Sequence, residues 1–176
     1  MRLGVDICNT IANVNLELLR RFETITFEKY PFPEVPREFF FTNDGLKTLW
    51  EAEPFPKAAQ TLYKLNNKGC QIVYVTSRNR MCGFVTKRWL EVHRFPKGPV
   101  FFVPQNEKAA FALKHDLKLF LEDDPDTAKA MVEAGIPVLL KDWQYNTHVQ
   151  GQKLQRFKSW REIKLIDRRF KNDRSK

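Results

Sequence analysis

Short apolar runs alternate with helical patterns along most of this chain. Each run holds four or five consecutive residues rich in Val, Ile, Leu and Phe, without the polar–apolar alternation of a half-exposed strand. Continuous runs of this kind are typical of parallel strands that are buried on both faces. Their alternation with helices predicts an α/β fold with a doubly wound parallel sheet. The predicted strands are residues 2–5, 71–75, 99–103, 117–121 and 137–140.

The helical patterns carry start and stop signals of their own. Gly69 and Gly135 follow two of them, at the position where glycine commonly ends a helix. Asp124 followed by Pro125 is typical of a helix N-cap and first turn. The predicted helices are residues 15–28, 44–51, 56–68, 82–93, 106–115 and 124–134.

Residues 12–55 interrupt this rhythm. They form an insertion of roughly 44 residues between the first strand and the next helix of the core, which is too long for an ordinary loop. We interpret the segment as a small helical cap over the strand ends. The predicted organisation is a core of residues 1–11 and 56–167, a cap of residues 12–55, and a basic C-terminal tail of residues 168–176.

The net charge of +9 is concentrated near the C-terminus. Residues 153–176 hold ten Lys or Arg and three acids, a net of +7, which leaves +2 for the preceding 152 residues. Such a segment attracts the phosphates of a nucleic acid, a nucleotide or an anionic surface. Phe157, Trp160 and Phe170 could stack on bases there. The alternatives are a solvated tail and a terminal helix that packs Trp160 and Ile163 onto the sheet.

Composition excludes several other classes of protein. A hydrophobic content of 43% with 15 Phe indicates a folded domain. No apolar run approaches the roughly 20 residues of a membrane span, and the N-terminus does not resemble a signal peptide, so we expect a cytoplasmic protein without a membrane partner. Three widely separated cysteines give neither a disulfide framework nor zinc-ligand spacing.

Polar side chains follow the predicted strands at their carboxyl ends, which is where doubly wound sheets bind ligands. Carboxylates from two strands can hold Mg²⁺, while hydroxyl groups and a lysine can bind phosphate oxygens. A carboxylate beside the metal can act as a nucleophile. Each group alone could instead cap a helix or shape a turn, but together they indicate phosphoryl chemistry. The residues are Asp6, Thr10, Thr76, Ser77, Arg78, Lys108, Glu122, Asp123 and Asp124.

Four segments then resemble the motifs of the haloacid dehalogenase (HAD) superfamily. Residues 6–10, Asp-Ile-Cys-Asn-Thr, resemble its first motif, Asp-x-Asp-x-Thr, and residues 75–78 are similar to the second. Lys108 is the best candidate for the lysine of the third motif, with Lys114 and Lys118 as alternatives. Residues 121–124, Leu-Glu-Asp-Asp, resemble the acidic fourth motif.

The likeness extends over about residues 2–167, to a bacterial and phage branch of 5′-nucleotidases related to the 5′(3′)-deoxyribonucleotidases. It includes Trp89-Leu90, residues 134–138, Tyr145-Asn146 and residues 159–163. This resemblance implies a Rossmann-like three-layer core with a small cap after the first strand. It also implies a Mg²⁺ cofactor and hydrolysis of a small phosphate monoester, a nucleotide above all, through an aspartyl-phosphate.

The resemblance also implies roles for individual residues. Asp6 would be the nucleophile and a metal ligand. The backbone carbonyl of Cys8 and the carboxylates of Asp123 and Asp124 would be further metal ligands, with Asp123 the preferred carboxylate. The phosphate-binding residues implied are Thr76, Ser77 and Lys108.

One departure from the pattern bears directly on activity. The second Asp of the first motif, the general acid and base of the family, is Cys8 here. A thiol with an ordinary pKa of about 8.5 is a poor replacement in either role. General acid–base assistance is typically worth about 10²–10⁴-fold, so a loss of that order is expected. Asn9 stands where the family usually has glycine, and asparagine tolerates the left-handed conformation better than most residues.

Three functions follow as alternatives. The first is a nucleotidase-like phosphatase with another source of protons. The second is a catalytically impaired domain that binds nucleic acid or protein through its basic C-terminal segment. The third is another reaction of the HAD superfamily, cleavage of a carbon–halogen or carbon–phosphorus bond. The resemblance implies a cap lysine for carbon–phosphorus cleavage, and Lys29 and Lys47 lie in the insertion, though neither is part of a recognisable motif. A small cap also leaves room for a homodimer in which a second subunit closes the site.

Overall fold

Six strands form one sheet in the computed structural model, which describes residues 1–36 and 38–163. The strand order is β3-β2-β1-β4-β5-β6, and every neighbouring pair is parallel. This confirms the predicted α/β fold with a parallel sheet. The strands are β1 (Arg2–Val5), β2 (Gln71–Thr76), β3 (Val100–Phe102), β4 (Leu119–Glu122), β5 (Val138–Lys141) and β6 (Leu154–Phe157).

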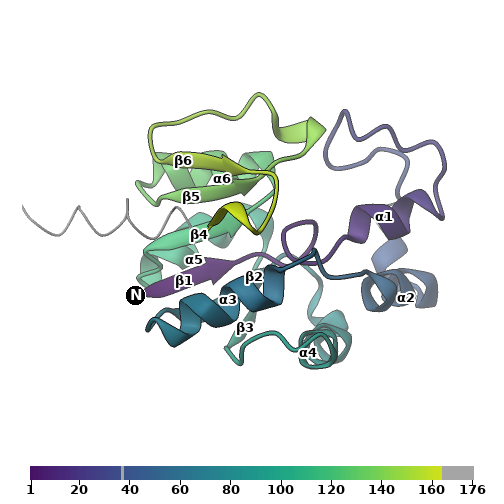
Figure 1. The fold of residues 1–176 in the computed structure, drawn as a ribbon. Helices are drawn as coiled ribbons and strands as arrows, with labels where there is room; N and C mark the ends of the chain where they lie inside the picture. Colours follow the sequence, from purple (N-terminus) through teal and green to yellow (C-terminus); the bar gives the residue numbers. More distant parts are fainter. Residues whose placement is uncertain (37, 164–176) are drawn as a thin grey trace, which may run out of the picture.

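Helices cover both faces of the sheet and make it the middle of three layers (Figure 1). One face packs against α3 (Ala58–Asn67) and α4 (Gly83–Val92), whose Leu62 and Trp89 belong to a cluster with Leu3. The other face packs against α5 (Lys108–Lys114) and α6 (Pro125–Glu133). The four inner strands β1, β2, β4 and β5 are therefore largely buried on both sides, which explains their mainly apolar sequences, whereas the edge strands β3 and β6 are mostly half-buried.

Gly4 in the central strand is required by close packing. Its register partner in β4 is Phe120, whose ring lies across the backbone of β1. A Cβ atom added at Gly4 would lie 2.3 Å from Cδ2 of Phe120 and 2.9 Å from Cδ1 of Leu117. The neighbouring residues Leu3 and Val5 point to the opposite face and are fully buried there.

The predicted strands and helices lie close to the observed ones, with two differences. β6 was not predicted, because its sequence Leu-Gln-Arg-Phe has only two apolar residues. The helix predicted over residues 15–28 is wrong in length, since α1 spans only Val14–Leu19. Beyond it the chain is rich in residues that disfavour helix, and Phe27 has a positive φ of 59°.

The inserted residues 12–55 lie beyond the carboxyl end of β1 (Figure 1). They contain α1, a 3₁₀ turn at Phe39–Phe41 and α2 (Asn43–Glu51). Leu18 and Leu49 belong to the same buried cluster as the core residues of the sheet. The indole Nε1 of Trp89 in α4 donates a hydrogen bond to the carbonyl of Ala52 at 2.7 Å. The insertion is thus packed against the core, and the proposed cap boundaries stay a prediction.

The described part of the basic C-terminal segment packs against the sheet. Phe157 and Trp160 are buried, so they do not present their rings for base stacking. The Nζ of Lys153 donates to the carbonyl of Gly135 at 2.9 Å, and Arg156 forms an ion pair with Asp142. The predicted tail of residues 168–176, including Phe170, lies outside the described residues, so the predicted nucleic-acid contact stays a prediction.

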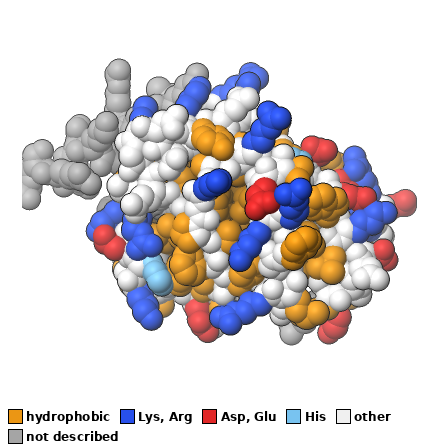
Figure 2. All heavy atoms as spheres, turned by 90° about the horizontal axis from the view of Figure 1, so that it is seen from below, with side chains coloured by type: hydrophobic (Ala, Val, Ile, Leu, Met, Phe, Trp, Pro, Cys, Tyr) orange, Lys and Arg blue, Asp and Glu red, His pale blue; other side chains and the backbone are white. Residues whose placement is uncertain are grey.

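One face of the molecule, drawn in Figure 2, carries both apolar and cationic side chains. Figure 2 shows hydrophobic side chains in several patches, bordered by Lys and Arg. Exposed aromatic side chains on the helices include Trp50, Tyr63 and Phe84. Within residues 1–36 and 38–163, no helix is long and apolar enough to cross a bilayer.

Candidate active site

Asp6 stands at the carboxyl end of the central strand. Its backbone N–H donates to the carbonyl of Leu121 at 2.9 Å, which extends the pairing of β1 with β4 by one residue. Its side chain is buried, with 4% of the residue exposed. Because β4 is the neighbour of β1, the acidic residues that follow β4 lie beside Asp6.

Lys108, the first residue of α5, places its ammonium group among these acids. Its Nζ lies 2.6 Å from Oδ1 of Asp6 and 3.0 Å from Oε2 of Glu122. Burial alone would lower the pKa of Lys108, but the two carboxylates outweigh it and raise the pKa above its ordinary value. The other two candidate lysines lie elsewhere: Lys114 is on the exposed end of α5, and Lys118 pairs with Asp116 at the surface.

Glu122 is fully buried and holds two neighbouring groups in place. Its Oε1 accepts hydrogen bonds from the backbone N–H groups of Asp123 and Asp124, at 3.0 and 3.2 Å. Burial raises the pKa of Glu122 well above its ordinary value, although Lys108 opposes the shift. From the sequence, Glu122 was predicted only to be an acidic residue at a strand end, and its ion pair with Lys108 was not predicted.

Asp123 is held by two hydroxyl groups from distant parts of the chain. Thr10 donates to its Oδ1 at 2.8 Å, and Tyr145 donates to its Oδ2 at 2.6 Å. The side-chain amide of Asn146 donates to its backbone carbonyl at 2.7 Å. Burial, and then the charge of Asp6, raise the pKa of Asp123 to about 8. The carboxyl group therefore sits where a proton or a cation is needed to balance charge.

Three buried carboxylates could share one cation. Asp6, Glu122 and Asp123 each offer an oxygen atom, and these atoms all lie within 4.8 Å of one another. The predicted ligand Asp124 is outside this group. Its Oδ1 caps α6 by accepting from the backbone N–H of Thr127 at 2.6 Å, and its Oδ2 accepts from Gln105 at 2.8 Å. Both carboxylate oxygens of Asp124 thus have protein partners, and its ligation of a metal stays a prediction.

The loop after β1 is fixed by side chains from the C-terminal part of the chain. Asn9 has a positive φ of 55°, as its replacement of a family glycine suggested. The indole of Trp143 donates to the carbonyl of Asn9 at 2.9 Å, and that of Trp160 donates to the carbonyl of Thr10 at 3.1 Å. The backbone carbonyl of Cys8, a predicted metal ligand, accepts from the N–H of Thr10 at 2.7 Å.

The second strand brings its polar residues to the other side of this loop. Thr76 is buried, and its Oγ1 accepts from the backbone N–H of Arg78 at 3.3 Å, while Ser77 is exposed. The Nε of Arg78 lies 3.1 Å from the Sγ of Cys8. Burial raises the pKa of the Cys8 thiol, with Arg78 opposing the shift. This contact between Arg78 and Cys8 was not predicted, because sequence alone does not pair side chains 70 residues apart.

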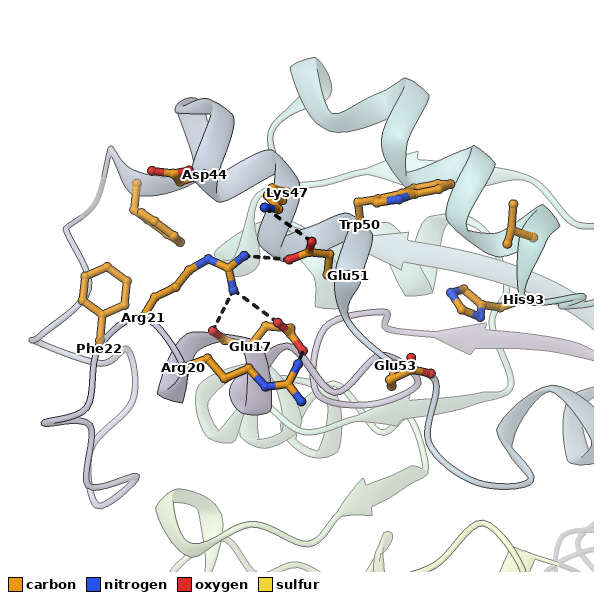
Figure 3. Close-up of a pocket in the computed structure, with 12 residues that line it drawn as sticks. Glu17, Arg20, Arg21, Phe22, Asp44, Lys47, Trp50, Glu51, Glu53 and His93 are labelled. Carbon is orange, nitrogen blue, oxygen red and sulfur yellow. Dashed lines mark hydrogen bonds and ion pairs between the residues drawn. The ribbon is translucent and has the colours of Figure 1, made fainter.

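Among the cavities that residues of the insertion border, one lies beside Cys8 and a larger one does not border Cys8. The first, of about 380 Å³, is bordered by Cys8, Ser77 and Arg78 together with apolar residues of the insertion. The second is an open hollow of about 1030 Å³ between α1, α2 and α4, away from the predicted site residues (Figure 3). In the second cavity Arg21 bridges Glu17 and Glu51, at 3.2 and 2.8 Å.

Lys47, one of the two lysines considered for carbon–phosphorus cleavage, borders this second cavity, and its Nζ lies 3.7 Å from Oε1 of Glu51 (Figure 3). Lys29, the other, is exposed. Neither residue borders the cavity beside Cys8.

Comparisons with known proteins agree on the fold. A hydrolase of the haloacid dehalogenase-like family from Streptococcus pneumoniae has a TM-score of 0.62 at 16% identity, with 94% of this chain and 97% of that chain covered. A D,D-heptose 1,7-bisphosphate phosphatase from B. bronchiseptica, complexed with magnesium and phosphate, has a TM-score of 0.59 at 10% identity, with 95% and 99% covered. The parallel sheet therefore has the HAD-like hydrolase fold.

Sequence comparisons identify the family. A nucleotidase from Clostridium acetobutylicum is 31% identical over 161 residues, which span 91% of this chain and 74% of that protein. A relative from Halalkalibacterium halodurans is 30% identical over 181 residues, with 93% and 90% covered. Residues 41–124 also match a family model described as PITM 1-3, LNS2 domain. The chain belongs to the HAD-like family that includes the Clostridium nucleotidase, which confirms the predicted resemblance.

Proposed function

We propose that this protein is a Mg²⁺-dependent phosphatase that hydrolyses small phosphate monoesters, with nucleoside monophosphates as the substrate class. The observation that carries the proposal is the buried group formed by Asp6, Asp123 and Lys108 at the carboxyl edge of the sheet. Membership in a family with a named nucleotidase supports the choice of substrate.

A divalent cation fits the side chains of this group. When ionised, Asp6, Glu122 and Asp123 carry three negative charges, and Lys108 supplies one positive charge, so a charge of about +2 would balance the group. The donor atoms are hard carboxylate oxygens, which Mg²⁺ prefers. Asp6, Asp123 and the carbonyl of Cys8 would hold the ion. When bound, Mg²⁺ would neutralise charge on the phosphoryl group and so lower the barrier to attack by a carboxylate.

Asp6 would act as the nucleophile. One of its carboxylate oxygens forms a bond to phosphorus while the bond from phosphorus to the leaving oxygen breaks, which gives an aspartyl-phosphate and an alcohol. Water then attacks the phosphorus of the aspartyl-phosphate, releases inorganic phosphate and regenerates Asp6. Lys108 holds Oδ1 of Asp6 at 2.6 Å and so fixes the orientation of the carboxylate.

Thr76 and Lys108 would bind the phosphoryl oxygens. The Oγ1 of Thr76 already accepts from the N–H of Arg78, so its hydroxyl proton is directed elsewhere and can be donated to a ligand. Ser77, exposed at the edge of the cavity beside Cys8, would donate a further hydrogen bond.

Protonation of the leaving oxygen would come from solvent. Burial raises the pKa of the Cys8 thiol, so Cys8 is a weaker acid here than a free cysteine. Substrates whose leaving group is stable as an anion would therefore react fastest.

The test is Mg²⁺-dependent release of phosphate from a panel of nucleoside monophosphates and p-nitrophenyl phosphate. The wild type should release phosphate, and Asp6→Asn should lower kcat by at least about 10³-fold, as expected when a nucleophile is removed. Asp126→Asn, the same change at an exposed position on α6, is the matched control and should retain activity. Equal activity in Asp6→Asn and wild type, or no activity in either with Mg²⁺, would contradict the proposal.

A further inference from the structure

The cavity beside Cys8 combines an apolar wall with one buried cation. Tyr30, Phe32, Phe40 and Phe41 of the insertion form much of its wall, and Cys8 and Arg78 lie on the side of the sheet. Its volume of about 380 Å³ is within the range of small-molecule sites. Asp6, Thr76 and Lys108 do not border it, so it is adjacent to the proposed phosphate site rather than part of it.

Arg78 uses only part of its hydrogen-bonding capacity within the protein. Its Nε donates to the Sγ of Cys8 at 3.1 Å, and its Nη1 donates to the Oγ1 of Thr86 in α4 at 3.1 Å. Its Nη2 is buried and has no hydrogen-bond partner among the described residues, while the residue as a whole is 8% exposed. The guanidinium plane is thus fixed at two nitrogens, with the third left to bind something else.

The electrostatic setting of Arg78 makes an acceptor necessary. Within residues 1–36 and 38–163, no carboxylate oxygen lies within 4.0 Å of its guanidinium nitrogens. A buried cation with an unsatisfied donor is costly unless a partner with lone pairs approaches it. Cys8 offers only a weak sulfur acceptor and no full negative charge.

We propose that Nη2 of Arg78 binds an oxygen atom on the leaving portion of the substrate, the part that remains after phosphate is removed. This inference rests on the proposed phosphatase function and specifies the substrate further. The leaving portion would have a flat aromatic ring that stacks against the aromatic wall and a carbonyl or hydroxyl oxygen that accepts from Arg78. A nucleoside supplies both, through its planar base and through the oxygen atoms of its sugar or base.

Cys8 has a definite role under this proposal. A carboxylate at residue 8 would lie within ion-pair distance of Arg78, given the present Nε to Sγ distance of 3.1 Å. It would engage the guanidinium in the free protein and compete with the substrate oxygen. The thiol is smaller and accepts hydrogen bonds only weakly, so it leaves Arg78 available to bind the substrate oxygen. The cysteine at residue 8 is therefore a condition for substrate binding by Arg78.

The test compares two ligands that share a phosphate-like group and differ in the leaving portion. Binding of inorganic phosphate and of a non-hydrolysable nucleoside 5′-phosphonate is measured by calorimetry with Mg²⁺, in the wild type, Arg78→Met, Arg78→Lys and Arg80→Met. Arg80 is exposed in the same loop and serves as the matched control. Arg78→Met should weaken phosphonate binding by about 10- to 100-fold, as for a lost hydrogen bond to a charged group, and change phosphate binding by less than about twofold. Arg80→Met should change neither.

Other results would overturn the proposal in distinguishable ways. If Arg78→Met weakens binding of both ligands equally, Arg78 binds the phosphate group. If it changes the affinity for neither ligand, Arg78 has only a structural role, through its contact with Thr86. If the wild type binds neither ligand, the proposed function fails and this inference fails with it. Arg78→Lys keeps the charge and most of the side-chain volume, so an intermediate loss for the phosphonate is expected even if Arg78→Met folds poorly.

Discussion

The ammonium nitrogen of Lys108 lies 2.6 Å from Oδ1 of Asp6, and both side chains are buried at the carboxyl edge of the sheet. Glu122 shares the same ammonium group at 3.0 Å. One cation therefore serves two carboxylates in the described part of the chain, with Asp123 close by. This arrangement makes the electrostatic balance of the site part of the stability of the fold.

Replacing Lys108 should test that coupling. Lys108→Met leaves Asp6 and Glu122 without their buried partner, so the free energy of unfolding in EDTA should fall by about 3–5 kcal/mol. Mg²⁺ should restore part of the loss, because it supplies positive charge to the same carboxylates. Urea denaturation in EDTA and in Mg²⁺ measures both effects. The control Lys118→Met breaks an exposed pair with Asp116 and should change stability by less than about 1 kcal/mol. Similar losses in the two variants would contradict the expectation.

Restoring a carboxylate at residue 8 should change which leaving groups are accepted. Cys8→Asp supplies a group that can protonate an alkoxide, so kcat/KM for alkyl phosphates should rise relative to p-nitrophenyl phosphate. We expect a rise of roughly 10- to 100-fold, at the lower end of general acid assistance, because pairing with Arg78 keeps the new carboxylate ionised. Steady-state kinetics on both esters measure the ratio. Cys8→Ser is the control for size. An equal rise of the ratio in Cys8→Ser would show that the effect of Cys8→Asp does not come from general acid catalysis.

Gly4 should be intolerant of the smallest possible addition. Gly4→Ala places a methyl group 2.3 Å from a ring carbon of Phe120, so the free energy of unfolding should fall by about 1–3 kcal/mol or more through overpacking. Gly83→Ala is the matched control, because its added Cβ would lie 3.7 Å from Phe102 in ordinary contact. Chemical denaturation should show Gly83→Ala within about 1 kcal/mol of the wild type. An unchanged Gly4→Ala would mean that the ring of Phe120 moves freely.

The pH dependence of stability should include a contribution from His93. Burial lowers the pKa of His93, although Glu53 opposes the shift, and its ring lies 4.6 Å from that of Trp89. The unfolded chain then takes up a proton near pH 6.5 before the folded protein does. The contribution is present above that pH and is lost as pH falls through the folded pKa.

Denaturation at pH 7.5 and pH 5.5 measures this contribution. The wild type should lose more stability over the interval than His93→Gln, which cannot take up the proton. His148→Gln, at an exposed position, should follow the wild type. If His93→Gln loses as much stability as the wild type, the histidine does not contribute.

The sequence predicted those parts of the molecule that depend on local pattern. Continuous apolar runs indicated five buried strands, and the rule that ligands bind at carboxyl strand ends placed Asp6 and Asp123 at one edge. β6 was not predicted, because Gln155 and Arg156 interrupt its apolar pattern. The length of α1 was overpredicted because the low helix propensity of Thr24, Ile25 and Thr26, which follow its end at Leu19, was given too little weight.

The residues of the candidate site that belong to local sequence motifs were predictable, whereas contacts between residues far apart in the sequence were not. The role of Asp124 as a helix cap was predictable from Asp124 followed by Pro125, and the structure shows this contact. The contacts of Arg78 with Cys8, and of Glu122 with Lys108, depend on side-chain directions between elements far apart in sequence. Such directions are set by packing, which no local pattern encodes.

The two indole hydrogen bonds to the loop after β1 have a consequence for how the protein matures. Trp143 and Trp160 hold the carbonyls of Asn9 and Thr10 from more than 130 residues away. The loop beside Asp6 is synthesised well before Trp143 and Trp160, so it gains these supports only after β5 and β6 have been added. A chain arrested before residue 143 would carry every residue of the proposed phosphate site but lack both indole anchors. The fluorescence of Trp143 and Trp160, followed during refolding, would thus report when both anchors of this loop form.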